Sequence, residues 1–200
     1  TIGATVYYIK ICYDNAVFSR AGRNSLLLTP DADEWSFTAE FSQPRPSAER
    51  SGGAAFSREA SSRYWNSYWE DGAVVDFSAC TDRRAAELER RVVLSQYLLA
   101  IQCCGDVPPQ ETGLTYNSWF GKHHMEMIWW HQAHFPLWGH GDLLDRTLPW
   151  YGKVEPVARG IAERQGFKGV RWMKMTDPSG LEAPSNTGSF LIWQQPHLIY

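Results

Sequence analysis

The sequence predicts a mainly α-helical domain that follows the end of a β-domain. Three observations support this fold class. Short β-type apolar stretches lie within the first fifty residues, a segment rich in Pro, Ser and Gly follows at 43–53, and helical spacing of apolar residues begins near residue 57. The expected organisation is therefore a β-domain end over 1–50 and a helical domain over 57–200.

Two strands are expected in the N-terminal part. Residues 4–13 (ATVYYIKICY) are rich in β-branched and aromatic side chains, and residues 35–41 (WSFTAEF) alternate with a period of two. Turn-forming residues lie between them at 14–15, 22–24 and 29–33. Two strands are too few for a stable sheet, so this part is expected to be the tail of a larger β-domain.

The first helix is expected to begin at Ser57 as its N-cap, with Trp65, Tyr68 and Trp69 on one side. The short apolar run at 73–79 (AVVDFSA) is then expected to form a connecting strand.

A long helix is expected next, capped by Thr81 or Asp82. Its apolar face follows helical spacing over Leu88, Val92, Ser95, Leu99 and Cys103. Gly105 and the prolines up to Pro109 are expected to end it, because proline cannot continue a helix.

Helical spacing resumes over 123–138 and again from Asp142, with an interruption at Pro149 and an end at Gly166. Residues 169–185 show no clear period and are expected to form a functional loop. A last helix is expected over 190–200, and because it ends without a cap the helical domain is expected to be incomplete at its C-terminus.

The composition argues against several classes of partner. The formal net charge is −3 and the sequence has no Lys/Arg cluster, which disfavours nucleic acid or an anionic membrane as the main partner. No apolar run approaches the roughly 20 residues of a membrane-spanning helix. The four cysteines lack the spacing of a metal site.

The segment 113–138 has an unusual composition for a protein core. It contains four histidines, one glutamate, one lysine and four tryptophans, whereas a core favours Leu, Ile and Val. Flat aromatic faces beside a few hydrogen-bonding groups suit a ligand that alternates C–H patches with hydroxyl groups. The segment therefore indicates a carbohydrate ligand, with an aromatic-rich core as the simpler alternative.

The order of the segments in 57–200 resembles the catalytic barrel of six-hairpin glycosidases, an (α/α)6 toroid. It is similar to a group of bacterial and fungal glycoside hydrolases and, more distantly, to glycoside hydrolase family sixty-five, which includes disaccharide phosphorylases and acid trehalases. The segments that carry the resemblance are WNSYW, ELERRVVLSQYLLAIQ, GLTYNSWFGKHHMEMIWWH, LLDRTLPWYGKVEPVARGIAERQGFKGVRWMKMTDPSGLEAP and SFLIWQQPHLIY. Residues 1–50 would then be the tail of the β-sandwich that precedes such a barrel.

The resemblance implies roles for particular residues. Glu126 occupies the place of the aspartate that grips the sugar on the non-reducing side of the cut. The family's Trp-Asp pair is Met125-Glu126 here, and its following Thr-Glu is Met127-Ile128, so the identity of the sugar stays open. The family's general acid lies further along the chain, beyond residue 200 on this alignment.

The loop WMKMTDPSGLE resembles a substrate-facing loop of the same family, which implies substrate contacts for Trp172, Asp177 and Glu182. Trp119 and Trp172 are expected to stack on sugar rings, and Glu126 or Glu182 is expected to do any proton transfer within this chain. The other expected substrate-binding residues are Lys122, His124, Trp130, His131, Lys174 and Gln194.

Simpler roles exist for several of these residues. Glu126 could pair with Lys122 one helical turn away, and Asp177 before Pro-Ser-Gly is a routine turn former. Gln194 could face solvent, and tryptophans at helical spacing are often core residues.

The histidines invite comparison with a zinc site, because His131 and His134 lie three residues apart. The HExxH arrangement is missing, however, so neither a metal nor another cofactor is expected.

The expected function is hydrolysis of a glycosidic bond with inversion, which needs an acid and a base roughly 6.5 to 9.5 Å apart. Two alternatives stay open: a phosphorylase like those of family sixty-five, and a carbohydrate-binding protein without catalysis. A barrel of this kind needs more helices than the sequence predicts, so the chain would be a fragment or would need further chain segments. Since enzymes that resemble it are exported, a secreted or periplasmic location is expected, with no signal peptide visible at Thr1.

Overall fold

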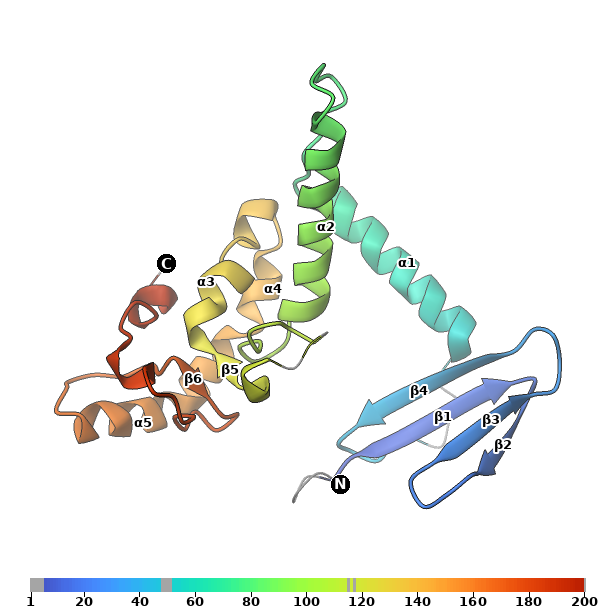
Figure 1. Ribbon diagram of the computed structural model, residues 1–200, viewed down its shortest axis with the longest axis horizontal. Coiled ribbons are helices and arrows are strands. Elements are labelled where there is room, and N and C mark those ends of the chain that lie inside the picture. Colours follow the sequence, from blue (N-terminus) through green and yellow to red (C-terminus); the bar gives the residue numbers. More distant parts are fainter. Residues whose placement is uncertain (1–5, 48–51, 115, 117, 200) are drawn as a thin grey trace. The chain divides into compact units, whose positions relative to one another are not determined.

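A computed structural model describes residues 6–47, 52–114, 116 and 118–199 (Figure 1). The chain divides into two compact units, Thr1–Ser67 and Tyr68–Tyr200. Parts of four sequence segments discussed above lie outside the described residues: 4–5 of the first strand, 48–51 of the linker, 115 and 117 of the motif GLTYNSW, and 200 at the end of the last helix.

The first unit contains two antiparallel sheets of two strands each. Strand β1 (Tyr8–Asp14) pairs with β4 (Ser36–Ser42), in a register that sets Tyr8 opposite Ser42 and Asp14 opposite Ser36. Within the described residues, both strands expected from the alternating and β-branched patterns are therefore confirmed.

The second pair of strands was not expected from the sequence. Strand β2 (Ala16–Arg20) pairs with β3 (Leu26–Pro30), and the turn between them is closed by hydrogen bonds from the amides of Ala21 and Gly22 to the carbonyl of Ser25. The turn signals around residues 22–24 correctly marked this hairpin turn, but the five-residue strands on each side of it were too short to recognise by periodicity.

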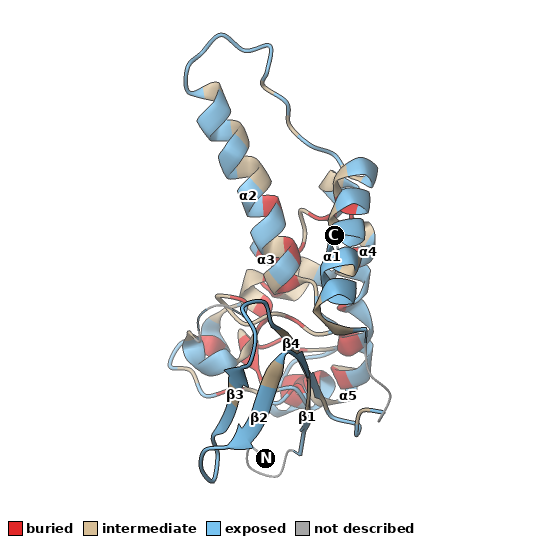
Figure 2. Ribbon diagram, turned by 90° about the vertical axis from the view of Figure 1, so that its right-hand side faces the viewer, coloured by how far each residue is buried: buried red, intermediate tan, exposed pale blue. Residues whose placement is uncertain are grey.

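The strands bury little apolar surface. None of the described residues between 6 and 47 is buried, and Figure 2 shows β1 to β4 almost entirely in the colour of exposed residues. Phe37 is 51% exposed and Phe41 is 66% exposed. Two-stranded sheets of this kind are marginally stable alone.

Three long helices follow the strands. Helix α1 (Gly53–Asp71) begins four residues before the expected N-cap, and the Ser57 hydroxyl donates to the Gly53 carbonyl inside the helix. The run at 73–79 forms no strand and continues into turns.

Helix α2 (Ala85–Cys103) begins close to the expected position. The expected cap by Thr81 or Asp82 is wrong, because the N-cap residue is Arg84 and no side chain caps the helix. The Asp82 carboxylate accepts a hydrogen bond from the Arg84 amide at 2.8 Å in the turn before the helix. The buried residues of this helix are Gln96, Ala100 and Cys103, whereas the expected core residue Leu88 is 52% exposed.

Helix α5 (Leu148–Arg164) matches its prediction most closely. Pro149 lies in its first turn, where a missing amide proton costs nothing, and Gly166 follows its end with a φ of +79°. Its buried face and the following loop form the core of the second unit, which comprises Met125, Trp150, Tyr151, Val154, Ala158 and Trp172.

The segment expected to form a helix over 123–138 is instead a series of short elements. These are strand β5 (His123–His124), a 3₁₀ turn (Met125–Met127), the single helical turn α3 (Ile128–His131) and a 3₁₀ turn (Pro136–Trp138). Aromatic residues and histidine have only modest helix propensity, and Pro136 and Gly139 interrupt the backbone pattern. Helix α4 (Gly141–Asp145) is also short.

The expectation of an (α/α)6 toroid segment behind a β-sandwich tail is therefore wrong for the described residues. A toroid needs successive helices packed as antiparallel hairpins, but α2 and α5, the two long helices that lie wholly in the second unit, share no extensive contact. Over the described part of 186–199, the helical elements are 3₁₀ turns at Gly188–Phe190 and Gln195–Leu198, in place of the expected last helix.

One buried polar residue connects the middle of the second unit. The Gln132 side-chain amide donates to the Cys103 carbonyl at 2.6 Å and to the Thr147 hydroxyl at 2.8 Å, and that hydroxyl donates to the Gly105 carbonyl at 2.9 Å. These bonds hold the end of α2 against the start of α5. Among the described residues, no helix is both long enough and apolar enough to cross a bilayer.

Candidate functional site

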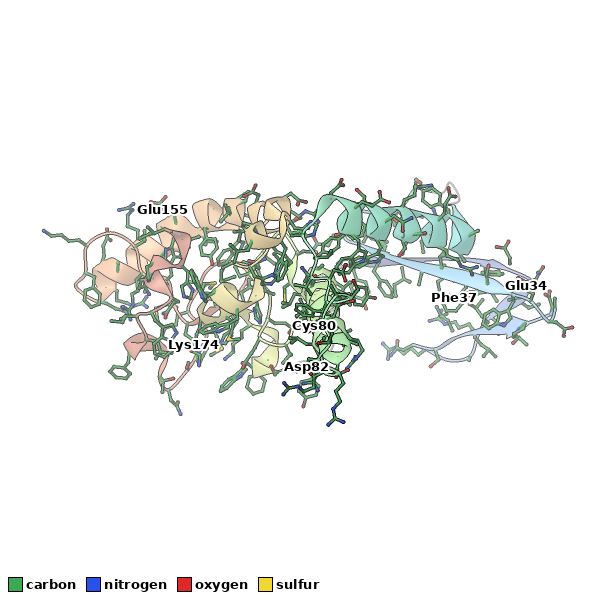
Figure 3. All side chains as sticks on the ribbon, turned by 90° about the horizontal axis from the view of Figure 1, so that it is seen from above. Glu34, Phe37, Cys80, Asp82, Glu155 and Lys174 are labelled. Carbon is green, nitrogen blue, oxygen red and sulfur yellow. The ribbon has the colours of Figure 1, made fainter. Side chains whose placement is uncertain are left out.

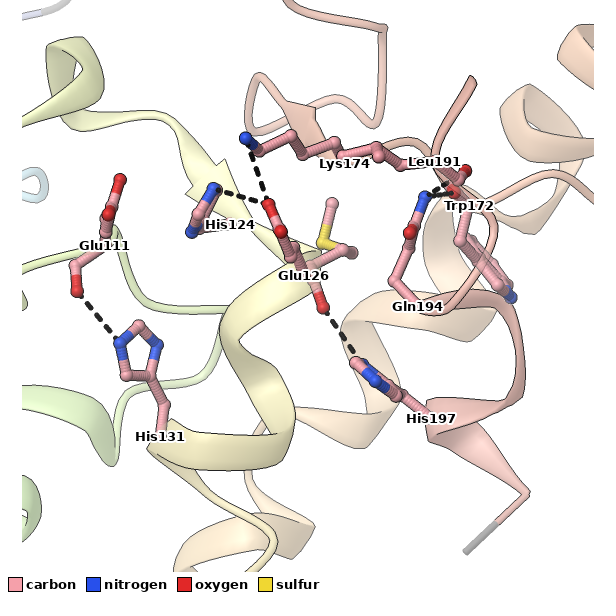
Figure 4. A network of polar contacts seen from close by, with 10 residues as sticks. Glu111, His124, Glu126, His131, Trp172, Lys174, Leu191, Gln194 and His197 are labelled. Carbon is pink, nitrogen blue, oxygen red and sulfur yellow. Dashed lines mark hydrogen bonds and ion pairs between the residues drawn. The ribbon is translucent and has the colours of Figure 1, made fainter. Parts of the chain in front are cut away.

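Glu126 and Lys174 form an ion pair at the join of two chain segments. Strand β5 pairs antiparallel with β6 (Met175–Thr176), and the Glu126 amide donates to the Lys174 carbonyl at 3.3 Å. This pairing brings Lys174 Nζ to 3.1 Å from Glu126 Oε2, with the two side chains 14% and 17% exposed. Figure 4 shows the pair from close by. A pair so well covered is screened little by salt.

His124 adjoins this pair and is neutral. Its Nε2 lies 3.6 Å from Glu126 Oε2, and the residue is only 2% exposed. Burial, and after it the nearby charge of Lys174, lower the pKa of His124 to about 4. Because the ring is uncharged near neutral pH, its contact with Glu126 is not an ion pair. Neither ring nitrogen makes a hydrogen bond with the described residues.

Trp119 is the exposed aromatic side chain beside the pair. Lys174 Nζ lies 5.0 Å from the centre of its ring, within the range of a cation–π contact, and the residue is 49% exposed. The backbone at Trp119 and Phe120 has φ values of +49° and +60°, which non-glycine residues rarely adopt. Strain of this kind is often found at functional sites.

Glu111 is a site residue that the sequence did not indicate. Its Oε2 is buried and makes no hydrogen bond with the described residues. Burial raises the pKa of Glu111; the charge of Lys174 acts against this, and the charge of Glu126 has a smaller effect in the direction of burial. A single glutamate in a loop carries no periodicity or motif, so only the fold could reveal its position. We call Glu111, Trp119, His124, Glu126 and Lys174 the Glu126 cluster.

His131 supports the cluster from α3. Its Nε2 lies 2.9 Å from the Glu111 carbonyl, which can only accept, so Nε2 carries the proton. Burial lowers the pKa of His131, which keeps the ring neutral and leaves Nδ1 as a buried acceptor without a hydrogen bond among the described residues.

Two of the expected loop residues have structural roles. Asp177 Oδ1 accepts hydrogen bonds from the Ser179 amide, the Ser179 hydroxyl and the Leu181 amide, at 2.9, 2.8 and 3.0 Å. This is the turn-forming role that was the simpler alternative for Asp177. Glu182 lies 3.6 Å from an Arg164 nitrogen and accepts from the Ser189 hydroxyl at 3.3 Å.

Trp172 and Gln194 lie in the interior and not on an open surface. Trp172 is 9% exposed and packs edge-on against Tyr151 with ring centres 5.1 Å apart. Gln194 is 2% exposed and donates to the carbonyls of Trp172 and Leu191 at 3.0 and 2.9 Å. Both therefore hold the last segment of the chain against the core, so Trp172 offers no open face for stacking.

The other two expected binding residues lie at the surface. Lys122 Nζ donates to the Pro184 carbonyl at 3.0 Å, and no ion pair forms between Lys122 and Glu126. Trp130 is 57% exposed. The simple i,i+4 pairing considered for Glu126 is thus replaced by its longer-range pair with Lys174.

Two of the cavities in the second unit differ in character. A cavity of about 180 Å³ is lined by Glu111, His131 and residues of α2 and the following loop. A larger groove of about 530 Å³ runs along the start of α2, where Figure 3 labels Cys80 and Asp82. The larger groove contains no residue of the Glu126 cluster, so volume alone does not locate the polar site.

Among the described residues, no group of three or more His, Cys, Asp or Glu side chains is placed to hold a metal ion. In comparisons with known proteins, no family model, no curated protein and no solved structure matches the chain. The function is therefore inferred from the chemistry of the Glu126 cluster.

Proposed function

We propose that the chain binds a carbohydrate at the Glu126 cluster and hydrolyses a glycosidic bond there with inversion. The observation that carries this proposal is the Glu126 carboxylate, which lies between the Lys174 ammonium and the buried neutral ring of His124. Such a carboxylate has a fixed orientation and accepts hydrogen bonds from hydroxyl groups or from a water molecule.

The aromatic side chain beside it suits the same class of ligand. Trp119 is half-exposed and lies next to Lys174, so an apolar ring face and charged hydrogen-bonding groups lie side by side. A sugar ring has an apolar face and a rim of hydroxyl groups, which correspond to these two features. A second carboxyl group, on Glu111, is near enough to interact electrostatically with Glu126, and glycoside hydrolysis uses two carboxyl groups.

The proposal is tested with aryl glycosides and disaccharides that differ in sugar and anomer. We expect release of reducing sugar by the purified chain, and ¹H NMR of the first product is expected to show the anomer opposite to that of the substrate. Glu126→Gln is expected to lower kcat/KM by about 10²-fold or more, since general base catalysis contributes factors of this size.

Trp119→Ala is expected to weaken carbohydrate binding, measured by titration calorimetry. Its matched control is Trp193→Ala, because Trp193 is 50% exposed against 49% for Trp119 and lies outside the cluster. Binding that depends on Trp119 without any turnover would indicate a carbohydrate-binding protein without catalysis. The absence of both binding and turnover across the panel would refute the proposal.

A further inference from the structure

The turn that carries Trp119 presents a second aromatic side chain to solvent. Trp119, Phe120 and Gly121 have φ values of +49°, +60° and +67°, so three consecutive residues adopt the left-handed conformation. Residues other than glycine rarely adopt it in succession. Phe120 is 85% exposed, so burial of its ring does not offset the strain. Backbone strain beneath an open aromatic ring is typical of a binding surface and not of a core.

Lys122 places a cation beside this ring. Its Nζ lies 5.5 Å from the centre of the Phe120 ring, within the range of a cation–π contact. The same Nζ donates a hydrogen bond to the Pro184 carbonyl at 3.0 Å. Pro184 follows Glu182 by two residues, and Glu182 forms a β-bridge with Thr176 of β6. The ammonium group is therefore bonded to the segment that continues the small sheet of β5 and β6.

The charge of Lys122 is not balanced within the described part of the chain. Lys122 takes part in no ion pair there, and the Pro184 carbonyl that it contacts is neutral. Lys174 differs, because Glu126 balances its charge at 3.1 Å. An ammonium group carries three N–H donors. Lys122 can therefore still bind an acceptor on a ligand, and a negatively charged acceptor would balance its charge.

We propose that Phe120 and Lys122 bind an acidic sugar residue, a uronic acid, next to the sugar that occupies the Glu126 cluster. The Phe120 ring stacks on the apolar face of this residue, and the Lys122 ammonium attracts its carboxylate. This proposal rests on the proposed function and names the class of carbohydrate, an oligosaccharide or polysaccharide that contains uronic acid. Because Trp119 and Phe120 each present one ring, a ligand that covers both has at least two sugar residues.

The chemistry of a uronic acid matches both side chains. Its ring has the C–H face that stacks on an aromatic side chain, and its carboxylate projects from the rim of the ring. A hydrogen bond from an ammonium group to a carboxylate is roughly twice as strong as one between neutral groups. A neutral sugar could use the Phe120 ring, but it would leave the charge of Lys122 without a counter-charge. Phe120 and Lys122 together therefore favour the acidic sugar over the neutral one.

The test compares oligosaccharides of uronic acids with their methyl esters, which keep the sugar ring but carry no charge. Oligomers of galacturonic, glucuronic and mannuronic acid serve as probes, and titration calorimetry measures their binding to the whole chain. The acid form is expected to bind about five- to tenfold more tightly than the ester. The preference is expected to shrink as the NaCl concentration rises from about 0.05 M to about 0.5 M, because salt screens exposed charges.

Lys122→Gln is expected to lower the affinity for the acid form to about that for the ester. Lys122→Arg keeps the charge and is expected to retain the preference for the acid. The matched control is Lys153→Gln, because Lys153 is exposed on α5 and forms no ion pair among the described residues. This control is expected to keep the preference of the wild type.

Phe120→Ala is expected to weaken the binding of both forms by about tenfold, because both stack on the ring. Its matched control is Phe190→Ala, since Phe190 is 81% exposed against 85% for Phe120. Phe120→Gly separates binding from folding. Glycine adopts a positive φ without strain, so this variant is expected to lose binding while its melting temperature stays the same or rises.

A chain that binds and cleaves no carbohydrate, acidic or neutral, would overturn the proposed function and this inference together. A chain that binds carbohydrate without preferring the acid to the ester, or that keeps the preference in Lys122→Gln, would overturn the inference alone. Circular dichroism checks that each variant is folded. If Lys122→Gln does not fold, the salt dependence of the wild-type preference decides in its place.

Discussion

Lys174 Nζ lies 3.1 Å from Glu126 Oε2, although the two residues belong to separate segments of the chain. The same ammonium group lies 5.0 Å from the ring centre of Trp119. One cation therefore joins the turn around 119–121, the segment after β5 and the segment before β6. Removing the charge of Lys174 would therefore weaken the contacts among all three segments.

Lys174→Met is expected to destabilise the fold by about 1–3 kcal/mol, because it leaves a poorly exposed carboxylate without its cation. The value is below that for fully buried pairs because Glu126 keeps 17% of its side chain exposed. Urea unfolding at pH 7 measures the change. Adding Glu126→Gln to Lys174→Met is expected to recover part of the loss, and Lys174→Arg to keep most of the stability. Equal stabilities for the single and the double variant would contradict the ion pair.

Acid is expected to weaken the fold through His124. Its pKa is about 4 in the folded chain and 6.5 without burial, so between these values only the unfolded chain binds the proton. Stability that is fully present above pH 6.5 is therefore lost as the pH falls toward 4, by up to about 3 kcal/mol for this residue.

His124→Gln is expected to flatten this part of the stability profile, because glutamine cannot bind the proton. Chemical unfolding at pH 4.5, 5.5, 6.5 and 7.5 measures the slope, and NMR titration of the His124 ring gives its pKa directly. A ring that titrates near 6.5, or an unchanged slope in the variant, would show that His124 is not buried as described.

Two glycine substitutions are expected to act in opposite directions. Gly180 has a φ of +85°, and an added Cβ would lie 2.7 Å from the Cβ of Val154, so Gly180→Ala is expected to cost about 1–3 kcal/mol. Gly160 lies inside α5 with no atom within 4 Å of an added Cβ. Gly160→Ala is expected to stabilise by about 0.5–1 kcal/mol. Thermal unfolding compares the two, and a neutral Gly180→Ala would mean that the 177–181 turn does not approach α5.

Gln132→Leu is expected to cost about 2–4 kcal/mol. The substitution removes both hydrogen bonds of the side-chain amide and leaves the buried Cys103 carbonyl without that donor. Thr147→Ser keeps the hydroxyl that accepts from Gln132 and is expected to cost less than Thr147→Val, which removes it. Urea unfolding measures all three, and similar values for the two Thr147 variants would argue against the hydroxyl's role.

Local sequence patterns predicted the elements that have a regular alternation of side chains or clear terminating residues. The alternation at 35–41 gave β4, and the proline and glycine at the ends of α5 gave its limits. The turn role of Asp177 also follows from its own sequence, because an aspartate before Pro-Ser-Gly bonds to amides two and four residues away.

Long-range pairing could not be predicted in the same way. Lys122 lies four residues before Glu126, a spacing that favours an ion pair within a helix. The segment is not a continuous helix, however, and Glu126 pairs with Lys174. Trp172 was expected to be open because it lies in a loop, but its ring packs against α5. The carboxyl group of Glu111 acquires its environment only from residues distant in the sequence.

The hydrogen bonds of Gln132 also govern how the second unit opens. Its side-chain amide and the Thr147 hydroxyl join the end of α2, the segment after α3 and the start of α5 through one chain of three bonds. Moving any one of these segments away from the others breaks at least one of the three hydrogen bonds. Their amides are therefore expected to exchange with deuterium together, as one cooperative unit, while the amides of the exposed β1 to β4 strands exchange much earlier.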